Sequence, residues 1–388
     1  MTEQAKVPAI RFAGFTDPWE QRKLGDVASS FDYGLNAAAT EYDGQNKYLR
    51  ITDIDDETHE FSKSDLTTPL ADLAMSADYL LKEGDLLFAR TGASVGKTYL
   101  YRQFDGMVYF AGFLIRARIG EGADPEFAYQ ATLTDAYKKY VAITSQRSGQ
   151  PGVNAQEYAD YQLMLPSKTE QQQIGMTLRS LDDLITLHQR KYDKLVVFKK
   201  SMLEKMFPKD GESVPEIRFA GFTDPWEQRK FSDIVDVCSG KDYKHLEEGP
   251  IPVYGTGGFM TSVDEALSYD RDAVGIGRKG TIDKPYLLKA PFWTVDTLFY
   301  AIPKSDMDLE FVHCSFLNVD WKSKDESTGL PSLSKEAINE TIALVPSFNE
   351  QSRLGEFFSD LDSLITLHQR KLELLQNIKK SLLDKMFA

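Results

Sequence analysis

The sequence predicts an α+β protein in which two globular α/β domains are joined by two long antiparallel helices that form a coiled coil, with a pseudo-two-fold internal repeat. Three observations predict this fold. A fourteen-residue segment occurs twice, a second segment recurs at a different offset, and the second segment has a helical periodicity of apolar residues. The chain has 388 residues, which is enough for two to three domains.

The repeats define the order of the domains. Residues 10–23, IRFAGFTDPWEQRK, recur unchanged at 217–230, and we call these segments the two boxes. Residues 184–191, LITLHQRK, recur at 364–371 within a longer and looser match. The boxes lie 207 residues apart and the later segments 180, so the region between them is 27 residues shorter in the second copy. The order is therefore box, variable region and helix, twice over.

The later repeats are predicted to be long helices. From 174 to 202 and from 354 to 382, apolar residues fall three or four positions apart, which places them in one stripe along a helix. Each helix should span about 35–40 residues, or roughly 55 Å at 1.5 Å per residue. We expect the two stripes to pack against each other, although each helix could instead pack on its own domain. His188 and His368 should lie in the seam, because no ligand cluster accompanies them.

The two variable regions are expected to share a fold with different insertions. They cover about 24–166 and 231–346, and Arg90-Thr91-Gly92 in the first is similar to Arg278-Lys279-Gly280 in the second. Short β-like runs alternate with helical runs, which is typical of an α+β domain. Examples are the β-like runs 47–54, 85–90 and 272–276 and the helical run 125–140.

Loops in both variable regions combine glycine with side chains that can contact nucleic acid. Glycine allows close approach of the backbone, arginine and lysine can bind guanine O6 and N7, and glutamine can pair with adenine. Ordinary surface loops contain the same residues. The candidate contacts are Arg90, Thr91, Ser94, Lys97, Gln146, Arg147 and Gln150 in the first region, and Lys241, Tyr243, Lys244, Tyr254, Thr256, Arg278 and Lys279 in the second.

Motifs for catalysis are incomplete. Residues 92–98 are similar to a phosphate-binding loop, but Thr91 stands where the first glycine is needed, so the spacing is one residue short. Asp17-Pro18-Trp19 lacks the second proline of an amino-methyltransferase motif, and the five histidines suggest no catalytic triad. We expect no metal site and no catalysis in this chain, and therefore a binding protein.

Composition bears on the compartment and the partner. Two cysteines cannot make a disulfide framework, the first fifteen residues do not resemble a signal peptide, and no apolar run approaches about 20 residues, so we expect a cytoplasmic protein without a membrane. The net charge of −14 argues against a nucleic-acid partner. However, residues 190–209 contain seven Lys/Arg against two Asp/Glu, so a local basic surface is possible.

Over essentially its whole length the chain resembles the specificity subunits of type I restriction–modification systems. The resemblance rests on several segments together: the boxes, and LITLHQRK followed by Lys-Met-Phe. It also rests on IPVYGTGG at 251–258, GRKGTI at 277–282 and GLPSL at 329–333.

The resemblance implies a division of labour. Each of two target recognition domains would read one half of a split site in double-stranded DNA, and the helices would act as a ruler between them. Two modification subunits, which carry S-adenosylmethionine and flip out adenine, would bind the boxes and helices. Restriction subunits would add ATP- and Mg-dependent translocation and cleavage, so no cofactor is expected in this chain. The expected domains are 1–166 (first box and recognition domain), 167–209 (first helix), 210–346 (second box and recognition domain) and 347–388 (second helix).

Partner docking is expected on the duplicated parts. An equal alternative for the boxes is a structural strap that packs against the helices. The predicted docking residues are Phe15, Trp19, Phe222, Trp226, Arg190, Lys191, Arg370 and Lys371. Two other classes of function stay open: a single-chain modification enzyme, which would need a cofactor pocket, and a coiled-coil scaffold that joins two ligand domains unrelated to DNA.

Overall fold

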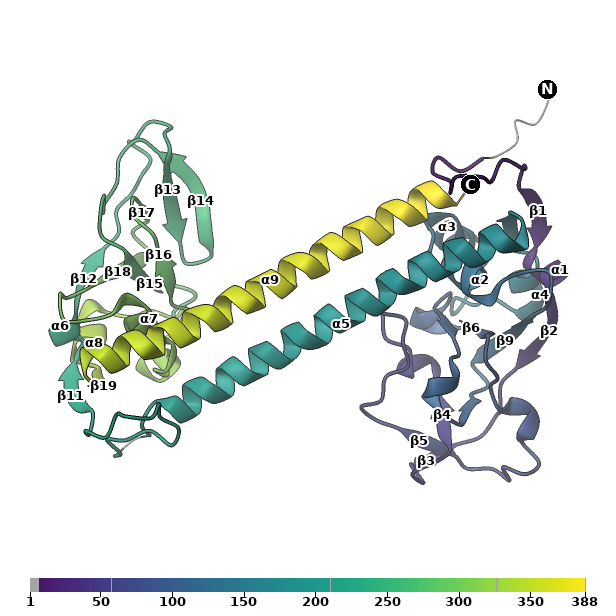
Figure 1. Ribbon diagram of the computed structural model, residues 1–388, viewed down its shortest axis with the longest axis horizontal. Helices are drawn as coiled ribbons and strands as arrows, with labels where there is room; N and C mark the ends of the chain where they lie inside the picture. Colours follow the sequence, from purple (N-terminus) through teal and green to yellow (C-terminus); the bar gives the residue numbers. More distant parts are fainter. Residues whose placement is uncertain (1–6, 57, 210, 326, 388) are drawn as a thin grey trace. The chain divides into compact units, whose positions relative to one another are not determined.

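The computed structural model describes residues 7–56, 58–209, 211–325 and 327–387. The chain divides into two compact units (Figure 1). Unit 1 comprises Met1–Gln189 and Arg370–Ala388, and unit 2 comprises Arg190–Gln369. Each unit therefore contains one box, one variable region, the first part of one long helix and the last part of the other.

Unit 1 is built around a four-stranded antiparallel sheet with the strand order β2-β9-β6-β7. A separate pair of strands, β1 and β10, joins the box to the segment that precedes the long helix. The elements in chain order are β1 (Glu20–Lys23), α1 (Leu24–Val27), β2 (Ala28–Tyr33), β3 (Ala39–Glu41), β4 (Lys47–Leu49), η1 (Ile51–Asp53), β5 (Thr67–Pro69), η2 (Ala77–Tyr79), β6 (Asp85–Ala89), η3 (Gly92–Ser94), β7 (Thr98–Leu100), η4 (Gln103–Asp105), β8 (Val108–Phe110), β9 (Leu114–Ile119), α2 (Pro125–Ala131), α3 (Asp135–Thr144), α4 (Ala155–Ala159), β10 (Gln162–Leu165) and α5 (Lys168–Met206).

Unit 2 repeats this plan with a four-stranded antiparallel sheet of order β12-β18-β15-β16. Where unit 1 has the two-stranded sheets β3-β5 and β4-β8, unit 2 has a three-stranded sheet of order β14-β13-β17. Its box strand β11 pairs with β19 as β1 pairs with β10. The elements are β11 (Glu227–Lys230), α6 (Phe231–Ile234), β12 (Val235–Ser239), β13 (Ile251–Gly255), β14 (Gly258–Val263), β15 (Ala273–Gly277), β16 (Tyr286–Leu288), β17 (Trp293–Thr294), β18 (Leu298–Pro303), α7 (Leu309–Leu317), η5 (Trp321–Lys324), α8 (Lys335–Glu340), β19 (Ile342–Val345) and α9 (Phe348–Met386).

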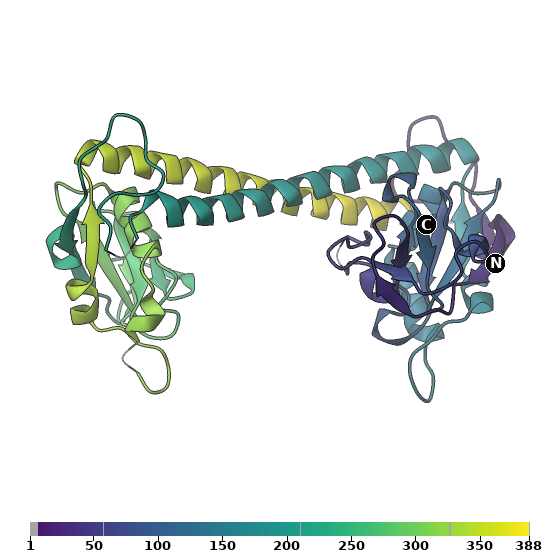
Figure 2. The same ribbon diagram turned by 90° about the horizontal axis from the view of Figure 1, so that it is seen from below.

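The long helices α5 and α9 have 39 residues each. In each unit a segment of α5 and a segment of α9 lie side by side with opposite chain directions (Figures 1 and 2). Lys379 Nζ lies 2.5 Å from Asp182 Oδ1 in unit 1, and Lys199 Nζ lies 2.6 Å from Asp362 Oδ1 in unit 2. The antiparallel pairing and the predicted fold class are confirmed.

The helices also belong to the hydrophobic cores of the units, so the alternative that each packs on a domain holds as well. In unit 1, Leu178 of α5 and Leu383 of α9 belong to the same cluster as the sheet residue Phe88. In unit 2, Met206 of α5 and Phe358 of α9 share a cluster with residues of β12 and β15. Replacing a buried leucine, methionine or phenylalanine by alanine costs about 2–5 kcal/mol, so each helix end is held firmly in its unit.

Two predicted elements were wrong in extent. The helical run 125–140 is two helices, α2 and α3, because the Thr134 hydroxyl caps a new helix by accepting a hydrogen bond from the Tyr137 amide. A polar cap of this kind favours a helix start over continuation. The strand predicted at 47–54 ends at Leu49, and a 3₁₀ turn (η1) follows. In the part of the chain that the structure describes, no helix is long and apolar enough to cross a membrane.

Candidate nucleic-acid interface

The two boxes make the same contacts in the two units. Arg11 donates hydrogen bonds of 2.6 and 2.8 Å from Nε and Nη2 to the carboxylate of Glu170, in the first turn of α5. Arg218 donates two hydrogen bonds of 2.7 Å to Glu350, in the first turn of α9. Both carboxylates are buried, which makes each box a strap that holds the start of a long helix.

Each box also closes the end of the other long helix. The Ile10 amide donates to the Lys385 carbonyl near the end of α9, and the Ile217 amide donates to the Lys205 carbonyl near the end of α5, both at 2.9 Å. The last carbonyls of a helix have no partner within the helix, so these bonds satisfy otherwise open acceptors. One box thus ties together the start of one helix and the end of the other.

The box tryptophans correct the docking prediction. Trp19 and Trp226 are 5 % and 3 % exposed, and their rings pack edge-on against Phe127 and Phe311 at 6.0 and 5.9 Å. Because both indoles lie in the cores, they cannot form an open docking surface, and the strap alternative describes them. Phe15 and Phe222 are partly exposed and stay candidates for docking, as do the exposed Arg190, Lys191, Arg370 and Lys371.

The structure exposes apolar residues in the LITLHQRK repeat that the sequence analysis did not select. Leu184 and Leu187 are 43 % and 45 % exposed, and Leu364 and Leu367 are each 44 % exposed. They were detectable from the sequence, because they lie off the apolar stripe of each helix and are identical in both copies. Leucines that stay exposed at equivalent places in both copies indicate a surface for a partner.

A second duplicated feature lies where the central strands β6 and β15 end. Arg90 follows β6, its amide donates to the Phe113 carbonyl at 3.0 Å, and its carbonyl accepts from the Val153 amide at 2.9 Å. We call residues 90–92 together with 145–153 the first corner. The Thr91 backbone forms an isolated bridge with Gly152, which fixes the two loops against each other.

The second corner, residues 278–280 with 327–333, repeats these bonds. The Arg278 amide donates to the Thr297 carbonyl at 2.8 Å, and the Leu333 amide donates to the Arg278 carbonyl at 3.0 Å. Lys279 pairs with Ser332 as Thr91 pairs with Gly152.

The glycines of the two corners also correspond. The Gly92 amide donates to Pro151 at 3.0 Å and the Gly280 amide to Pro331 at 2.8 Å. Both glycines have positive φ angles, 70° and 90°, which side chains rarely allow.

The first corner borders a cleft of about 780 Å³. The Arg90 guanidinium lies 5.1 Å from the centre of the Tyr33 ring and 5.9 Å from that of Phe113, a residue that is 56 % exposed. The described residues that line the cleft include a second arginine, Arg50, and no carboxylate. Arg50 is paired with Asp53 at 2.8 Å, so the charge that this cleft can offer to a nucleic acid is that of Arg90, beside exposed aromatic rings.

The second corner gathers more of the predicted contacts around residues 294–297. The Lys241 amide donates to the Thr294 carbonyl at 2.9 Å, and the Tyr254 carbonyl accepts from the Val295 amide at 3.0 Å. Arg278 bonds to the same turn, so these three candidates meet there. Thr256 lies on the adjoining β13–β14 hairpin, which exposes Phe259 and Met260, two residues that the sequence analysis missed. Lys244 is exposed, and Tyr243 is partly buried against a cluster that contains Trp293.

Three other candidates, Gln146, Arg147 and Gln150, lie in loop 145–153 of the first corner. The Arg147 guanidinium is bonded to the Glu157 carboxylate, with one contact of 2.7 Å, so it holds the start of α4. Gln146 and Gln150 are exposed, and Ser94 is half-buried in η3.

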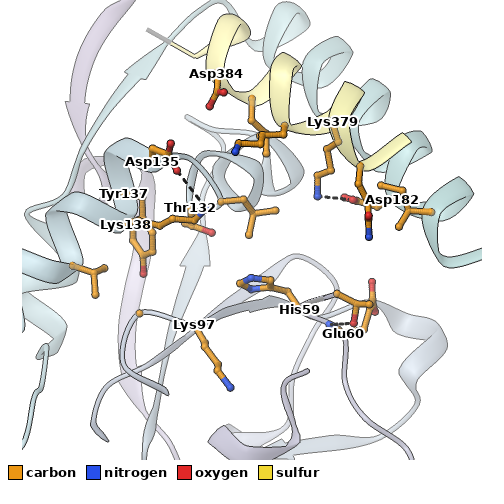
Figure 3. Close-up of a pocket in the computed structure, with 18 of the residues that line it drawn as sticks. His59, Glu60, Lys97, Thr132, Asp135, Tyr137, Lys138, Asp182, Lys379 and Asp384 are labelled. Carbon is orange, nitrogen blue, oxygen red and sulfur yellow. Dashed lines mark hydrogen bonds and ion pairs between the residues drawn. The ribbon is translucent and has the colours of Figure 1, made fainter. Parts of the chain in front are cut away.

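Lys97 faces a different part of unit 1. It is ion-paired with Asp56 and lines a cavity of about 720 Å³ between loop 58–60, α3 and the paired helices (Figure 3). Burial lowers the pKa of His59 in this cavity and raises the pKa of Glu60. No group of three or more His, Cys, Asp or Glu side chains suited to a metal occurs among the residues that the structure describes.

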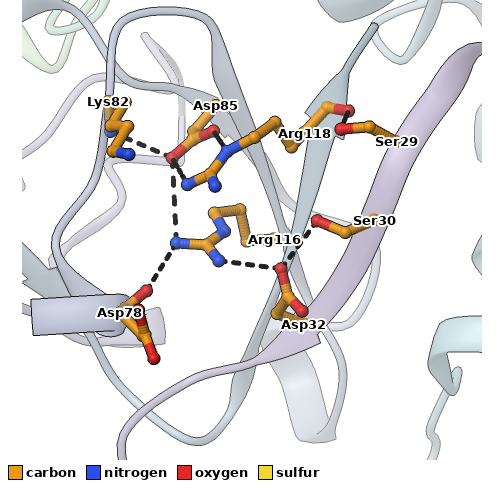
Figure 4. Close-up of polar contacts among 8 residues, drawn as sticks. All are labelled: Ser29, Ser30, Asp32, Asp78, Lys82, Asp85, Arg116 and Arg118. Carbon is orange, nitrogen blue, oxygen red and sulfur yellow. Dashed lines mark hydrogen bonds and ion pairs between the residues drawn. The ribbon is translucent and has the colours of Figure 1, made fainter. Parts of the chain in front are cut away.

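The sheets behind the two corners differ in chemistry. In unit 1, Arg116 donates to Asp32 at 2.7 Å, and Arg118 donates to the buried Asp85 at 3.0 Å (Figure 4). Burial by itself would raise the pKa of Asp32, but hydrogen bonds from Arg116 and Ser30 bring it below its ordinary value.

The strand registers place Cys238, Tyr300 and Ala273 of unit 2 at the positions that Asp32, Arg116 and Asp85 occupy in unit 1, in that order. These residues belong to a mainly apolar cluster. The fold of the two variable regions is therefore shared while their side chains have diverged.

The two units have the same backbone fold, the same strap and an equivalent corner with an arginine. This arrangement is that of a recognition protein built from two copies of one unit. The family model of the type I restriction modification DNA specificity domain matches residues 16–196 and 223–377, one match for each copy. The chain belongs to this family, and the resemblance noted in the sequence is confirmed.

Similar proteins agree with this assignment. The type I restriction enzyme MjaVIII specificity subunit of Methanocaldococcus jannaschii is 21 % identical over 95 % of this chain and 92 % of its own length. The putative MjaX specificity subunit of the same organism is 20 % identical over the same shares. The crystal structure of a type I S subunit from M. genitalium has the same fold, with a TM-score of 0.70, 18 % identity and 99 % of both chains covered.

Proposed function

We propose that this chain is the DNA-reading subunit of a type I restriction–modification complex, in which each unit recognises one half of a bipartite site. The observation that carries the proposal is the pair of corners, which share their backbone bonds but differ in the side chains around them. Two different half-sites on one duplex require this combination, because the DNA backbone is common to both while the bases differ. The chain itself would perform no catalysis.

The duplicated helices would serve the partners. Two modification subunits need two equivalent surfaces, and the exposed leucines 184 and 187 and their copies at 364 and 367 supply apolar contacts of that kind. S-adenosylmethionine, ATP and Mg would reside on the modification and restriction subunits. The positive charge of those partners would share the neutralisation of phosphates, which would offset the acidic net charge of this chain.

The first experiment is to co-express the chain with its cognate modification subunit and to map adenine methylation across the host genome. The expected result is one motif with two specified halves around a fixed gap. Replacing residues 24–166 by the corresponding region of another specificity subunit should then change one half and leave the other intact. A change of both halves would contradict independent recognition. No motif from an assembled, cofactor-loaded complex would favour a scaffold without DNA recognition.

A second experiment tests the helices as a spacer. Inserting four residues at Asp193 and four at Glu373 lengthens each helix by about one turn, or ~6 Å. The gap in the methylated motif should grow by one or two base pairs. A methylated motif with its original gap would show that the helices do not set the spacing.

A further inference from the structure

Two arginines keep the same place in the two units although their surroundings have changed. Arg90 and Arg278 each follow the central strand of a four-stranded sheet, and their amide and carbonyl groups make equivalent bonds. Behind them, the ion pair of Asp32 and Arg116 is replaced in unit 2 by the uncharged pair Cys238 and Tyr300. Because this positive charge is retained while its neighbours diverge, we expect the group that it contacts to be the same in both units.

Neither guanidinium is neutralised within the described part of the chain. Arginines of the neighbouring strand, Arg116 and Arg118, are ion-paired, whereas the described residues offer no carboxylate partner to Arg90 or Arg278. Arg90 instead lies against two aromatic rings, and its buried Nε has no hydrogen-bond partner. The Arg278 guanidinium lies 5.8 Å from the centre of the Phe299 ring and donates to the Asp296 carbonyl at 3.3 Å. Both charges are therefore held in place and remain available to an anion.

Rings and backbone bonds limit the movement of the two side chains, which suits a fixed anion better than a variable one. The bases of two half-sites differ, but the phosphates of the duplex are the same chemical group at both. We propose that Arg90 and Arg278 each bind a DNA phosphate, one in each half-site, and set the register of their unit on the duplex. This inference rests on the proposed function and leaves base recognition to divergent neighbours such as Gln150 in unit 1 and Phe259 in unit 2.

The competing assignment is that the two arginines read guanine through O6 and N7. The two assignments predict different behaviour. A lost phosphate contact weakens binding to every sequence alike and reduces its salt dependence. A lost guanine contact changes the preferred base at one position of one half-site.

The test uses the complex of the full chain with its modification subunits, and duplexes that carry either the methylated motif or a scrambled version. Binding is measured by fluorescence anisotropy between 50 and 200 mM NaCl. Each phosphate contact contributes about 0.9 to the slope of log affinity against log salt. Over this fourfold range, R90Q should therefore lose about 3.5-fold less affinity than the wild type, and R90Q/R278Q about 12-fold less. Binding to the two duplexes should weaken by the same factor, and the methylated motif should not change.

Matched controls lie at the other ends of the same strands. Lys82 precedes β6 and Arg271 precedes β15, so K82Q and R271Q remove the same charge away from the corners and should leave the slope unchanged. R90K keeps the charge and should keep most of the slope. A variant that only loosened the fold would lower the active fraction in a stoichiometric titration without altering the slope.

Two results would overturn the inference. If R90Q altered one base pair of the motif, or changed the ratio of affinities for the two duplexes tenfold, Arg90 would be a base reader. If R90Q/R278Q kept the affinity and the salt slope of the wild type, neither arginine would contact a phosphate. A wild-type complex that did not distinguish the two duplexes would instead refute the proposed function, whereas the salt slopes of R90Q and R90Q/R278Q would still report on the phosphate contacts.

Discussion

Replacing Glu170 by alanine should destabilise unit 1 by about 1.5–3 kcal/mol, because the partly buried Arg11 guanidinium loses its charged hydrogen-bond partner. The Glu170 side chain is 0 % exposed and that of Arg11 is 12 % exposed. Both hydrogen bonds of the pair, at 2.6 and 2.8 Å, are lost at once. The corresponding variant E350A should have at least as large an effect on unit 2, because Glu350 also accepts a hydrogen bond from the Trp226 indole.

Two further variants separate the causes of this loss. R11M/E170L removes both charges and keeps apolar volume, so it should destabilise unit 1 much less than E170A does. The reason is that the attraction within a buried ion pair is little larger than the free energy lost when its two charges are desolvated. D160A removes the exposed ion pair with Lys23 in unit 1, and it should have a much smaller effect than E170A.

Hydrogen exchange of the amides in β1 and β10 is the suitable assay, because a chain of two units need not unfold in one step. These amides report the opening of unit 1 alone. If E170A changed their protection by less than about 1 kcal/mol, the pair would behave as a surface salt bridge and the box would not be a strap. If R11M/E170L were as damaging as E170A, lost packing rather than an unpaired charge would be the cause.

Three other outcomes follow from single sites. Burial lowers the pKa of His313 to about 4, so this histidine stays neutral in the folded protein. The free energy of unfolding of unit 2 should therefore fall by on the order of 3 kcal/mol as the pH falls from about 6.5 to 4. H313N should remove this pH dependence, as measured by denaturation at a series of pH values. A Cβ at Gly34 would overlap a backbone carbonyl of the facing turn, so G34A should abolish recognition of one half-site in methylation mapping, whereas G149A, which meets nothing, should not. L187N and L367N should each weaken capture of one modification subunit at least tenfold in a titration, with unchanged melting temperatures; wild-type capture by L187N/L367N would exclude these leucines as docking contacts.

Local patterns in the sequence were sufficient for the large features of the fold. The three-four spacing of apolar residues predicted both long helices, and the identical boxes predicted two equivalent units. The extent of the helical run 125–140 was not predictable in this way, because Thr134 acts through a hydrogen bond to a backbone amide rather than through hydropathy. Amphipathic spacing alone does not reveal such a cap.

The candidate site was predictable in part. Similarity of two tripeptides singled out Arg90 and Arg278, and both lie at equivalent corners. The direction of the Lys97 side chain was not predictable, because its partner Asp56 lies in a separate loop, 41 residues earlier in the chain. The partner of Arg11 lies 159 residues away, so the strap depends on long-range folding that no local motif records.

The way each box closes a helix of the other copy has a consequence for the origin of the molecule. One copy alone, consisting of a box, a variable region and a helix, would leave the end of its helix open and its box without a second helix to close. Two identical copies would satisfy all these bonds by exchanging helices, and such a homodimer would recognise a palindrome. Fusion of the two copies into one chain removes the need for identity. Each half is then free to acquire its own target, and an asymmetric site becomes accessible through changes in one half at a time.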